Sequence, residues 1–208
     1  MHFDDFQYLF PPRPNKSIPQ GLLGFYEQRG YIAQAKKNGA CSVIAISPDK
    51  KITAMNRHRE AHKAWTANPE TMTLFTDLPG DGWYVFVAEL LHAKVAGIKD
   101  TNYINDVLVV DGKYLVGTNF VERQAMLQTM FLTGDETETD SHFVLNKTTW
   151  LARNHSSGFD ALFTSLDKPE DEGLVLKSPK VPLAPCFREG SNEGWQVKCR
   201  RQTKNFGF

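Results

Sequence analysis

Short apolar runs alternate with turn-forming residues along most of the chain, a pattern that predicts many short strands joined by tight turns. Strands are expected over residues 31–36, 42–46, 52–56, 83–92, 105–116 (a hairpin turning at Asp111-Gly112), 142–145, 172–177 and 194–201. The first three are expected to form a meander, with Asn38-Gly39 and Pro48-Asp49 in its turns. The run 83–92 holds mostly strand-forming residues, which is typical of a buried central strand.

Helices are expected between the strands, at residues 21–29, 58–67, 119–131 and 157–166. The clearest start signal is Asn119 followed by Glu122, the spacing of a capping box. Residues 134–140 are acidic and predict a surface loop. Residues 1–20 carry aromatic rings and then Pro11-Pro12-Arg13-Pro14, which predicts an arm lying on a domain of residues 21–208. The mixture predicts an α+β fold.

Composition narrows the class of protein. The 208 residues are 41% hydrophobic, enough for a sizeable core. The 24 basic and 24 acidic residues cancel, which argues against binding nucleic acid by overall charge alone. Three widely spaced cysteines form no CxxC pair, and the N-terminus has no apolar signal core. With no stretch long enough to span a membrane, we expect an intracellular, cytoplasmic protein.

Four residues carry candidate chemistry. Lys36 lies at a strand end beside Asn38-Gly39, where a lysine can be partly desolvated and act as a nucleophile; the alternative is an ordinary hairpin with two exposed lysines. Glu89 is a carboxylate inside an apolar strand, unless it marks the exposed end of that strand. His58 and His62 have the spacing of a metal-binding pair on a helix, although an exposed helix face is the favoured interpretation.

A set of short motifs gives these positions a common meaning. In chain order they are Lys36-Lys37-Asn38-Gly39, Arg57, Val87-Ala88-Glu89-Leu90, Asn105-Asp106-Val107-Leu108, Asp111-Gly112, Gly117, Glu122-Arg123, Glu172-Gly173-Leu174-Val175 and Lys198-Cys199-Arg200. In this order the chain resembles the covalent nucleotidyltransferases, the family of ATP-dependent DNA and RNA ligases and mRNA-capping guanylyltransferases. The resemblance extends from Ala33 to Arg200.

The chain departs from the family pattern in three ways. Asn105 stands where the family has an aromatic residue that stacks on the purine, which leaves Tyr103 or another ring for that role. Arg200 replaces the second lysine of the last motif. Ligases usually carry a further C-terminal domain, for which residue 208 leaves no room, so we expect a minimal enzyme, a fragment, or a clamp supplied otherwise.

The resemblance implies a ligase-type nucleotidyltransferase fold, in which antiparallel sheets flanked by helices enclose a nucleotide cleft. It implies that Lys36 attacks the α-phosphorus of ATP to form lysyl-AMP, that AMP passes to a nucleic-acid 5′-phosphate, and that a 3′-hydroxyl then seals the break. The implied catalytic residues are Lys36, Lys198 and Arg200. The implied nucleotide-binding residues are Gln34, Asn38, Gly39, Arg57, Glu89, Glu172 and Lys177, and Glu89 and Glu172 would also bind Mg²⁺ or Mn²⁺.

Lys36→Ala or Lys36→Arg is accordingly expected to abolish transfer of label from α-labelled ATP, whereas Lys37→Ala is not. Two alternatives stay open from the sequence. One is a capping-type guanylyltransferase, or another nucleotidyltransferase with a different acceptor. The other is a non-catalytic nucleic-acid-binding module, against which the zero net charge counts.

Overall fold

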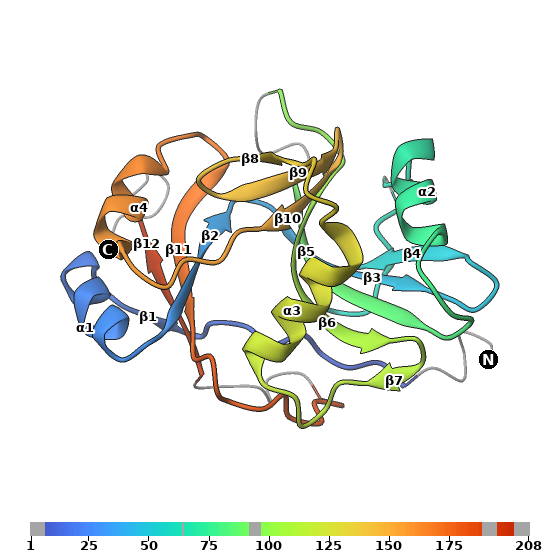
Figure 1. Ribbon diagram of the computed structural model, residues 1–208, viewed down its shortest axis with the longest axis horizontal. Coiled ribbons are helices and arrows are strands. Elements are labelled where there is room, and N and C mark those ends of the chain that lie inside the picture. Colours follow the sequence, from blue (N-terminus) through green and yellow to red (C-terminus); the bar gives the residue numbers. More distant parts are fainter. Residues whose placement is uncertain (1–6, 64, 92–96, 189–194, 202–208) are drawn as a thin grey trace.

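The strands form two sheets that lie side by side (Figure 1). The computed structural model describes residues 7–63, 65–91, 97–188 and 195–201. The four-stranded sheet has the order β1 (Lys16–Ser17), β12 (Gln196–Arg200), β11 (Asp171–Lys177), β2 (Ile32–Lys37). The eight-stranded sheet has the order β4 (Ile52–Met55), β3 (Ala40–Ile46), β5 (Tyr84–Leu91), β6 (Thr101–Val110), β10 (Thr149–Ala152), β9 (His142–Asn146), β8 (Thr137–Glu138), with β7 (Lys113–Tyr114) paired to β6.

Neighbouring strands are antiparallel except in two places. β1 runs parallel to β12, and β10 runs parallel to β6. The hairpin of β6 and β7 and the central position of β5 confirm the sequence predictions. β10 and the two-residue strand β8 were not predicted, and β8 lies inside the expected loop 134–140.

The predicted meander is wrong at its first turn. β2 does not pair with β3; it pairs with β11, while β3 pairs with β4 and β5. Asn38 and Gly39 therefore carry the chain from one sheet to the other. β3 pairs instead with β5, and β2 pairs with β11; each partner lies at least 38 residues away in the chain, and a local turn signal carries no information about it.

In the described part of the chain, five short helical segments accompany the sheets: η2 (Gln20–Leu22), α1 (Leu23–Gln28), α2 (Pro69–Thr76), α3 (Phe120–Phe131) and α4 (Phe159–Ser165). The capping box at the start of α3 is present, because the Asn119 side chain accepts from the Glu122 amide and the Glu122 carboxylate accepts from the Asn119 amide. Within the described residues, no helix combines the length and apolar character needed to cross a membrane.

The predicted helix over residues 58–67 is wrong. The Asn56 side chain accepts hydrogen bonds from the amides of His58 and Glu60, and Arg59 has a φ of +66°. Both features close a turn and stop a helix. The helix begins later, at α2, where Asn68 is the N-cap and Pro69 occupies the first turn.

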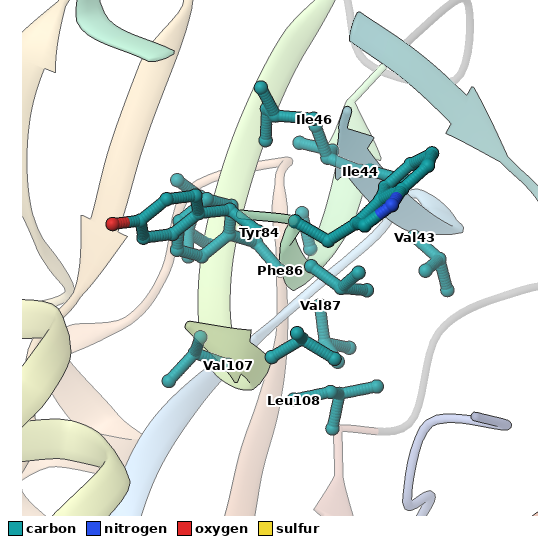
Figure 2. Close-up of a cluster of buried hydrophobic side chains, with 14 of the residues drawn as sticks. Val43, Ile44, Ile46, Tyr84, Phe86, Val87, Val107 and Leu108 are labelled. Carbon is teal, nitrogen blue, oxygen red and sulfur yellow. The ribbon is translucent and has the colours of Figure 1, made fainter. Parts of the chain in front are cut away.

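Each sheet has its own hydrophobic core. In the larger sheet, side chains from β3, β5 and β6 interdigitate, including Ile44, Phe86 and Leu108 (Figure 2). α3 packs against this core through Leu127 and Phe131. The second core lies between the smaller sheet and helices α1 and α4. Because each sheet is stabilised separately, the space between them can remain open as a pocket.

The described part of the N-terminal arm connects the two cores. Tyr8 and Leu9 are buried in the core of the eight-stranded sheet, and Ile18 is buried in the other. Between them the chain (dark blue in Figure 1) passes from the β7 side of the molecule to β1. Proline restricts the backbone on both sides of Arg13, so this residue is held on a stiff segment between two anchored ends.

Candidate active site

Lys36 and Lys37 are neighbours at the end of β2, and they point to opposite faces of the sheet. The Lys37 side chain is fully buried, and its Nζ donates to Asp171 Oδ1 at 2.7 Å and Ser141 Oγ at 3.1 Å. The Lys36 side chain keeps 15% of its surface exposed, and its Nζ is paired with Glu172. The motif's first lysine therefore faces the pocket, and its second belongs to the interior.

A β-bulge produces this arrangement. Lys37 pairs with Asp171 and Lys36 pairs with Gly173, so Glu172 is the extra residue between them. The bulge turns Glu172 toward Lys36 while Asp171 faces Lys37. Gly173 adopts a φ of +131°, and a Cβ there would collide with the backbone carbonyl of Cys199 on β12. The glycine that follows Glu172 is thus required by the close approach of β12.

Gly39 is required by packing rather than by a hairpin. An added Cβ would lie 2.5 Å from the Leu90 carbonyl oxygen and 2.7 Å from Glu89 Cγ. This absence of a side chain lets the crossover pass directly beside the end of β5, where Glu89 lies. Asn38, next to it, donates its amide to the Glu170 carbonyl oxygen.

A pocket of about 600 Å³ lies where the two sheets meet, which is within the usual range for a small-molecule site. It is lined by all of the sequence-predicted site residues except Asn38: Gln34, Lys36, Gly39, Arg57, Glu89, Glu172, Lys177, Lys198 and Arg200. These residues come from β2, the crossover, the segment after β4, β5, β11 and β12. The fold thus brings together residues separated by up to 166 positions in the sequence, from Gln34 to Arg200.

Cations gather at one end of the pocket. Arg200 Nε lies 3.6 Å from the Glu172 oxygen that also contacts Lys36, so two cations share one carboxylate. Burial lowers the pKa of Lys198, and the nearby charges of Arg200, Lys36 and Arg13 lower it further. Such a group of positive side chains suits a phosphate.

Glu89 lies near different charges. On β5, Glu89 is paired with Cys41 of the neighbouring strand β3 and with Tyr103 of the neighbouring strand β6. Burial raises the pKa of the Cys41 thiol to about 12, with Glu89 adding to this rise and Arg57 and Arg13 opposing it. Glu89 and Arg57 are therefore close to the same buried thiol, and Arg13 of the arm influences both Cys41 and Lys198.

The pocket supplies only part of a metal site. Glu89 and Glu172 both line it, but among the described residues no group of three or more potential metal ligands occurs. Two carboxylates suit a Mg²⁺ ion that takes its remaining ligands from water and substrate phosphates, which is how this ion is usually bound. His58 and His62 do not form a pair: His58 contacts the Arg57 guanidinium and His62 contacts the Cys41 carbonyl.

Buried polar groups also line the pocket. Gln34 is 1% exposed, and Lys177 is buried with its Nζ donating to the Asn105 carbonyl oxygen at 3.0 Å. Burial lowers the pKa of Lys177 to about 8, against the opposing charge of Asp106 and with a further lowering by Arg123.

Among the described residues, two phenyl-type rings line the pocket, those of Phe10 and Tyr103. Tyr103 is the ring that the sequence suggested for the role of the missing ring at position 105, with any other ring left open; it is buried, and the Lys37 ammonium lies over it. The other is Phe10 of the arm, which sequence reasoning missed together with Arg13. The run Pro11-Pro12-Arg13-Pro14 indicated an arm, but nothing in the local sequence indicates that it crosses a pocket.

Several solved ligase structures are similar in fold to this chain. Mycobacterial DNA ligase D, complexed with ATP and MES, matches with a TM-score of 0.66 at 17% identity, over 98% of this chain and 62% of that one. The ligase domain of LigD from M. tuberculosis gives a TM-score of 0.66 at 17% identity, over 96% and 61% of the two chains. The ATP-dependent DNA ligase of bacteriophage T7, complexed with ATP, gives 0.51 at 13% identity, over 89% and 60%.

The chain therefore has the ligase-type nucleotidyltransferase fold that its motifs predicted. It spans about three fifths of the length of these neighbours. No protein-family model and no curated protein sequence matches it. The likeness to known proteins is thus one of fold, and the chemistry has to be argued from the pocket.

Proposed function

We propose that the protein is an ATP-dependent polynucleotide ligase, or the adenylyltransferase domain of one. The observation that carries this proposal is the position of Lys36. It is a partly exposed amine inside the pocket of a ligase-type fold, beside Glu172 and close to the cations Lys198 and Arg200. A lysine nucleophile needs this combination of limited solvent access and a bound phosphate at its tip.

In the proposed first step, Lys36 Nζ forms a bond to the α-phosphorus of ATP as the bond from that phosphorus to the pyrophosphate oxygen breaks. The Lys36 ammonium must first lose a proton, with solvent water as the acceptor, and its contact with Glu172 must break. Arg200 already approaches the same Glu172 oxygen, so the carboxylate can turn toward Arg200 and free Lys36. Lys198 and Arg200 would then hold the α-phosphate and stabilise its charge during transfer.

The remaining residues fit the rest of a nucleotide. Glu89, Arg57 and Gly39 are assigned to the ribose and phosphate side, and Gln34 and Lys177 to the base side; Asn38, which does not line the pocket, is assigned no contact. Glu89 and Glu172 would hold Mg²⁺ or Mn²⁺, which when bound neutralises part of the phosphate charge. AMP would pass from Lys36 to a nucleic-acid 5′-phosphate, and attack by a 3′-hydroxyl would release AMP and join the strands.

The test uses ATP labelled at the α-phosphate. Wild-type protein with Mg²⁺ is expected to take up acid-labile label, and Lys36→Ala and Lys36→Arg are expected to take up none. Lys113→Arg, an exposed lysine on β7 outside the pocket, is the matched control and is expected to behave as wild type. Label on the Lys36 variants would refute the proposal.

The acceptor is tested next. Labelled protein is mixed with nicked DNA, nicked duplex RNA, and single strands bearing a 5′-phosphate and a 3′-hydroxyl. Release of AMP with joining of any of these supports the ligase and identifies its strand type. Label that no nucleic acid removes would contradict a polynucleotide acceptor.

A further inference from the structure

The proline-rich part of the N-terminal arm, residues 10–15, lines the pocket. Arg13 is the one charged residue in this stretch, and it is exposed. The prolines on both sides of it hold the backbone extended. Lys36, Lys198 and Arg200 reach the pocket from strands, whereas the Arg13 guanidinium reaches it from a stiff segment outside both sheets.

Contacts at both ends fix this segment in place. Before it, the Arg59 guanidinium carbon lies 5.0 Å from the ring centres of both Tyr8 and Phe10. After it, the Ile18 amide donates to the Lys198 carbonyl oxygen at 2.9 Å. The arm is thus held by the loop after β4 on one side and by β12 on the other, and both of these elements supply cations to the pocket.

The charge of Arg13 acts on two sides of the pocket. Burial is the largest cause of the lowered pKa of Lys198, and the charge of Arg13 contributes to it. Burial is also the largest cause of the raised pKa of Cys41, which the charge of Arg13 opposes. Cys41 is paired with Glu89 on the neighbouring strand. The guanidinium is therefore close to the Lys198 side and to the Glu89 side of the pocket.

The pocket holds more positive charge than a nucleoside monophosphate would balance. Among its described lining residues, seven lysines and arginines accompany two glutamates. Lys37 pairs with Asp171 outside the lining, which leaves six cations for two carboxylates. A monophosphate brings a charge of roughly −1.5 to −2 at neutral pH. A longer phosphate chain balances the remaining charge better.

Exposure indicates which cation meets the outer phosphates. Lys177, assigned to the base side, is 3% exposed, whereas the side chains of Lys36 and Arg200 are 15% and 36% exposed. A nucleotide with its base near Lys177 and its α-phosphate at Lys36 and Arg200 extends its remaining phosphates toward solvent. The exposed Arg13 lines that part of the pocket's surroundings from the arm.

We propose that Arg13 binds the β- and γ-phosphates of ATP, and that Arg59 is a positioning residue that holds the arm against the pocket. This inference deepens the proposed function and rests on it in taking the pocket as a nucleotide site. A guanidinium can donate two parallel hydrogen bonds to phosphate oxygens. Because the β- and γ-phosphates depart together as pyrophosphate, Arg13 would stabilise the charge of the leaving group.

The experiment measures equilibrium binding of α,β-methylene-ATP and of AMP with Mg²⁺ present. A methylene group replaces the oxygen between the first two phosphates, so pyrophosphate cannot leave and no adduct forms. Arg13→Gln is expected to weaken binding of α,β-methylene-ATP by roughly tenfold and binding of AMP by less than about twofold. Arg13→Lys keeps the charge but not the paired donors and is expected to fall between. The matched control is Lys16→Gln, an exposed cation of the same arm outside the pocket lining, which is expected to bind both nucleotides as wild type.

Arg59→Gln removes the guanidinium from the rings of Tyr8 and Phe10 without removing a group that lines the pocket. It is expected to weaken binding of α,β-methylene-ATP by roughly two- to fivefold and to leave AMP binding unchanged. In the double variant Arg13→Gln/Arg59→Gln the loss should be no larger than in Arg13→Gln alone, because Arg59 acts through Arg13. Additive losses, or equal weakening of both nucleotides by Arg59→Gln, would contradict a positioning role.

Equal weakening of both nucleotides by Arg13→Gln, or no weakening of either, overturns the inference. So does an Arg13→Gln variant that keeps wild-type binding of α,β-methylene-ATP but binds a 5′-phosphorylated strand more weakly, since Arg13 would then serve the nucleic acid. The binding measurement is independent of covalent transfer. If Arg13→Gln selectively weakens α,β-methylene-ATP but wild type forms no adduct on Lys36, the proposed function fails and this inference stands. If the adduct forms and Arg13→Gln binds both nucleotides as wild type, the reverse holds.

Discussion

Removing the ammonium of Lys37 should be far more damaging than a surface lysine substitution. In Lys37→Met the Asp171 carboxylate stays buried with its counter-charge gone, and the ammonium that lay over the rings of Tyr103 and Trp150 is lost. Leaving one member of a buried ion pair uncompensated costs about 3–5 kcal/mol. This is a large share of the roughly 5–15 kcal/mol that stabilises a typical domain.

The intact Lys37–Asp171 ion pair contributes much less to the free energy of unfolding than the removal of one partner costs. Burial raises the pKa of Asp171 in spite of the opposing charge and hydrogen bond of Lys37, which shows that desolvation outweighs the attraction. In the double variant Lys37→Met/Asp171→Leu both charges are gone, and the stability should return to within about 1 kcal/mol of wild type or exceed it. The penalty in Lys37→Met alone should also shrink as the pH falls, because Asp171 can then be buried protonated.

Urea unfolding of the four members of this double-mutant cycle measures the effect directly. A loss below about 1 kcal/mol in Lys37→Met would refute the claim that Lys37 and Asp171 form an essential buried pair. The result also matters for the labelling experiment. Lys37→Ala, the control that the sequence suggested for Lys36, is expected to be destabilised, so a loss of label in that variant would say nothing about the nucleophile.

Three further outcomes follow from the packing and the buried bases. Gly39→Ala should cost about 1–3 kcal/mol in urea unfolding and reduce labelling, because its Cβ would lie 2.7 Å from Glu89 Cγ; wild-type stability and labelling would contradict the close approach. Burial, with Lys37 and Lys168 adding to it, lowers the pKa of His142 from 6.5 to about 3. The unfolded chain takes up the His142 proton at a higher pH than the folded chain, so stability should fall as the pH drops below 6.5, by at most about 1.4 kcal/mol per pH unit. Thermal unfolding at pH 7 and pH 5 should show a smaller fall for His142→Phe than for wild type. Burial lowers the pKa of Lys177 to about 8, so the unfolded state holds more protons than the folded state between pH 8 and 10.5. The free energy of unfolding should therefore rise with pH over this range in wild type but not in Lys177→Met. The same pH dependence of urea unfolding in both proteins would contradict this.

Local signals in the sequence were sufficient for elements whose determinants lie within a few residues. The capping box of α3, the turn between β6 and β7, and the apolar run of β5 all belong to this group. The start of α2 had an equally local signal, Asn68 followed by Pro69, which the helical spacing of residues 58–67 obscured. The turn formed by the Asn56 side chain was the competing local feature.

Pairing between distant segments could not be predicted in the same way. Asn38-Gly39 gives the same local signal in a hairpin as in a crossover between sheets, and only β5 and β11 decide between them. The motif chose Lys36 over Lys37, but the bulge that turns Glu172 toward Lys36 lies in the pairing of β2 with β11, two strands far apart in the sequence.

The pocket residues outside the motifs needed the three-dimensional structure. The arm brings Phe10 and Arg13 to the pocket because its two ends are anchored in different cores.

The most direct test of the central claim is to locate the adduct. Wild-type protein is incubated with ATP and Mg²⁺, digested, and analysed by fragmentation mass spectrometry that distinguishes Lys36 from Lys37. The account predicts AMP joined to the side-chain nitrogen of Lys36 alone. AMP on Lys37, Lys198 or any other residue, or no adduct at all, would contradict it.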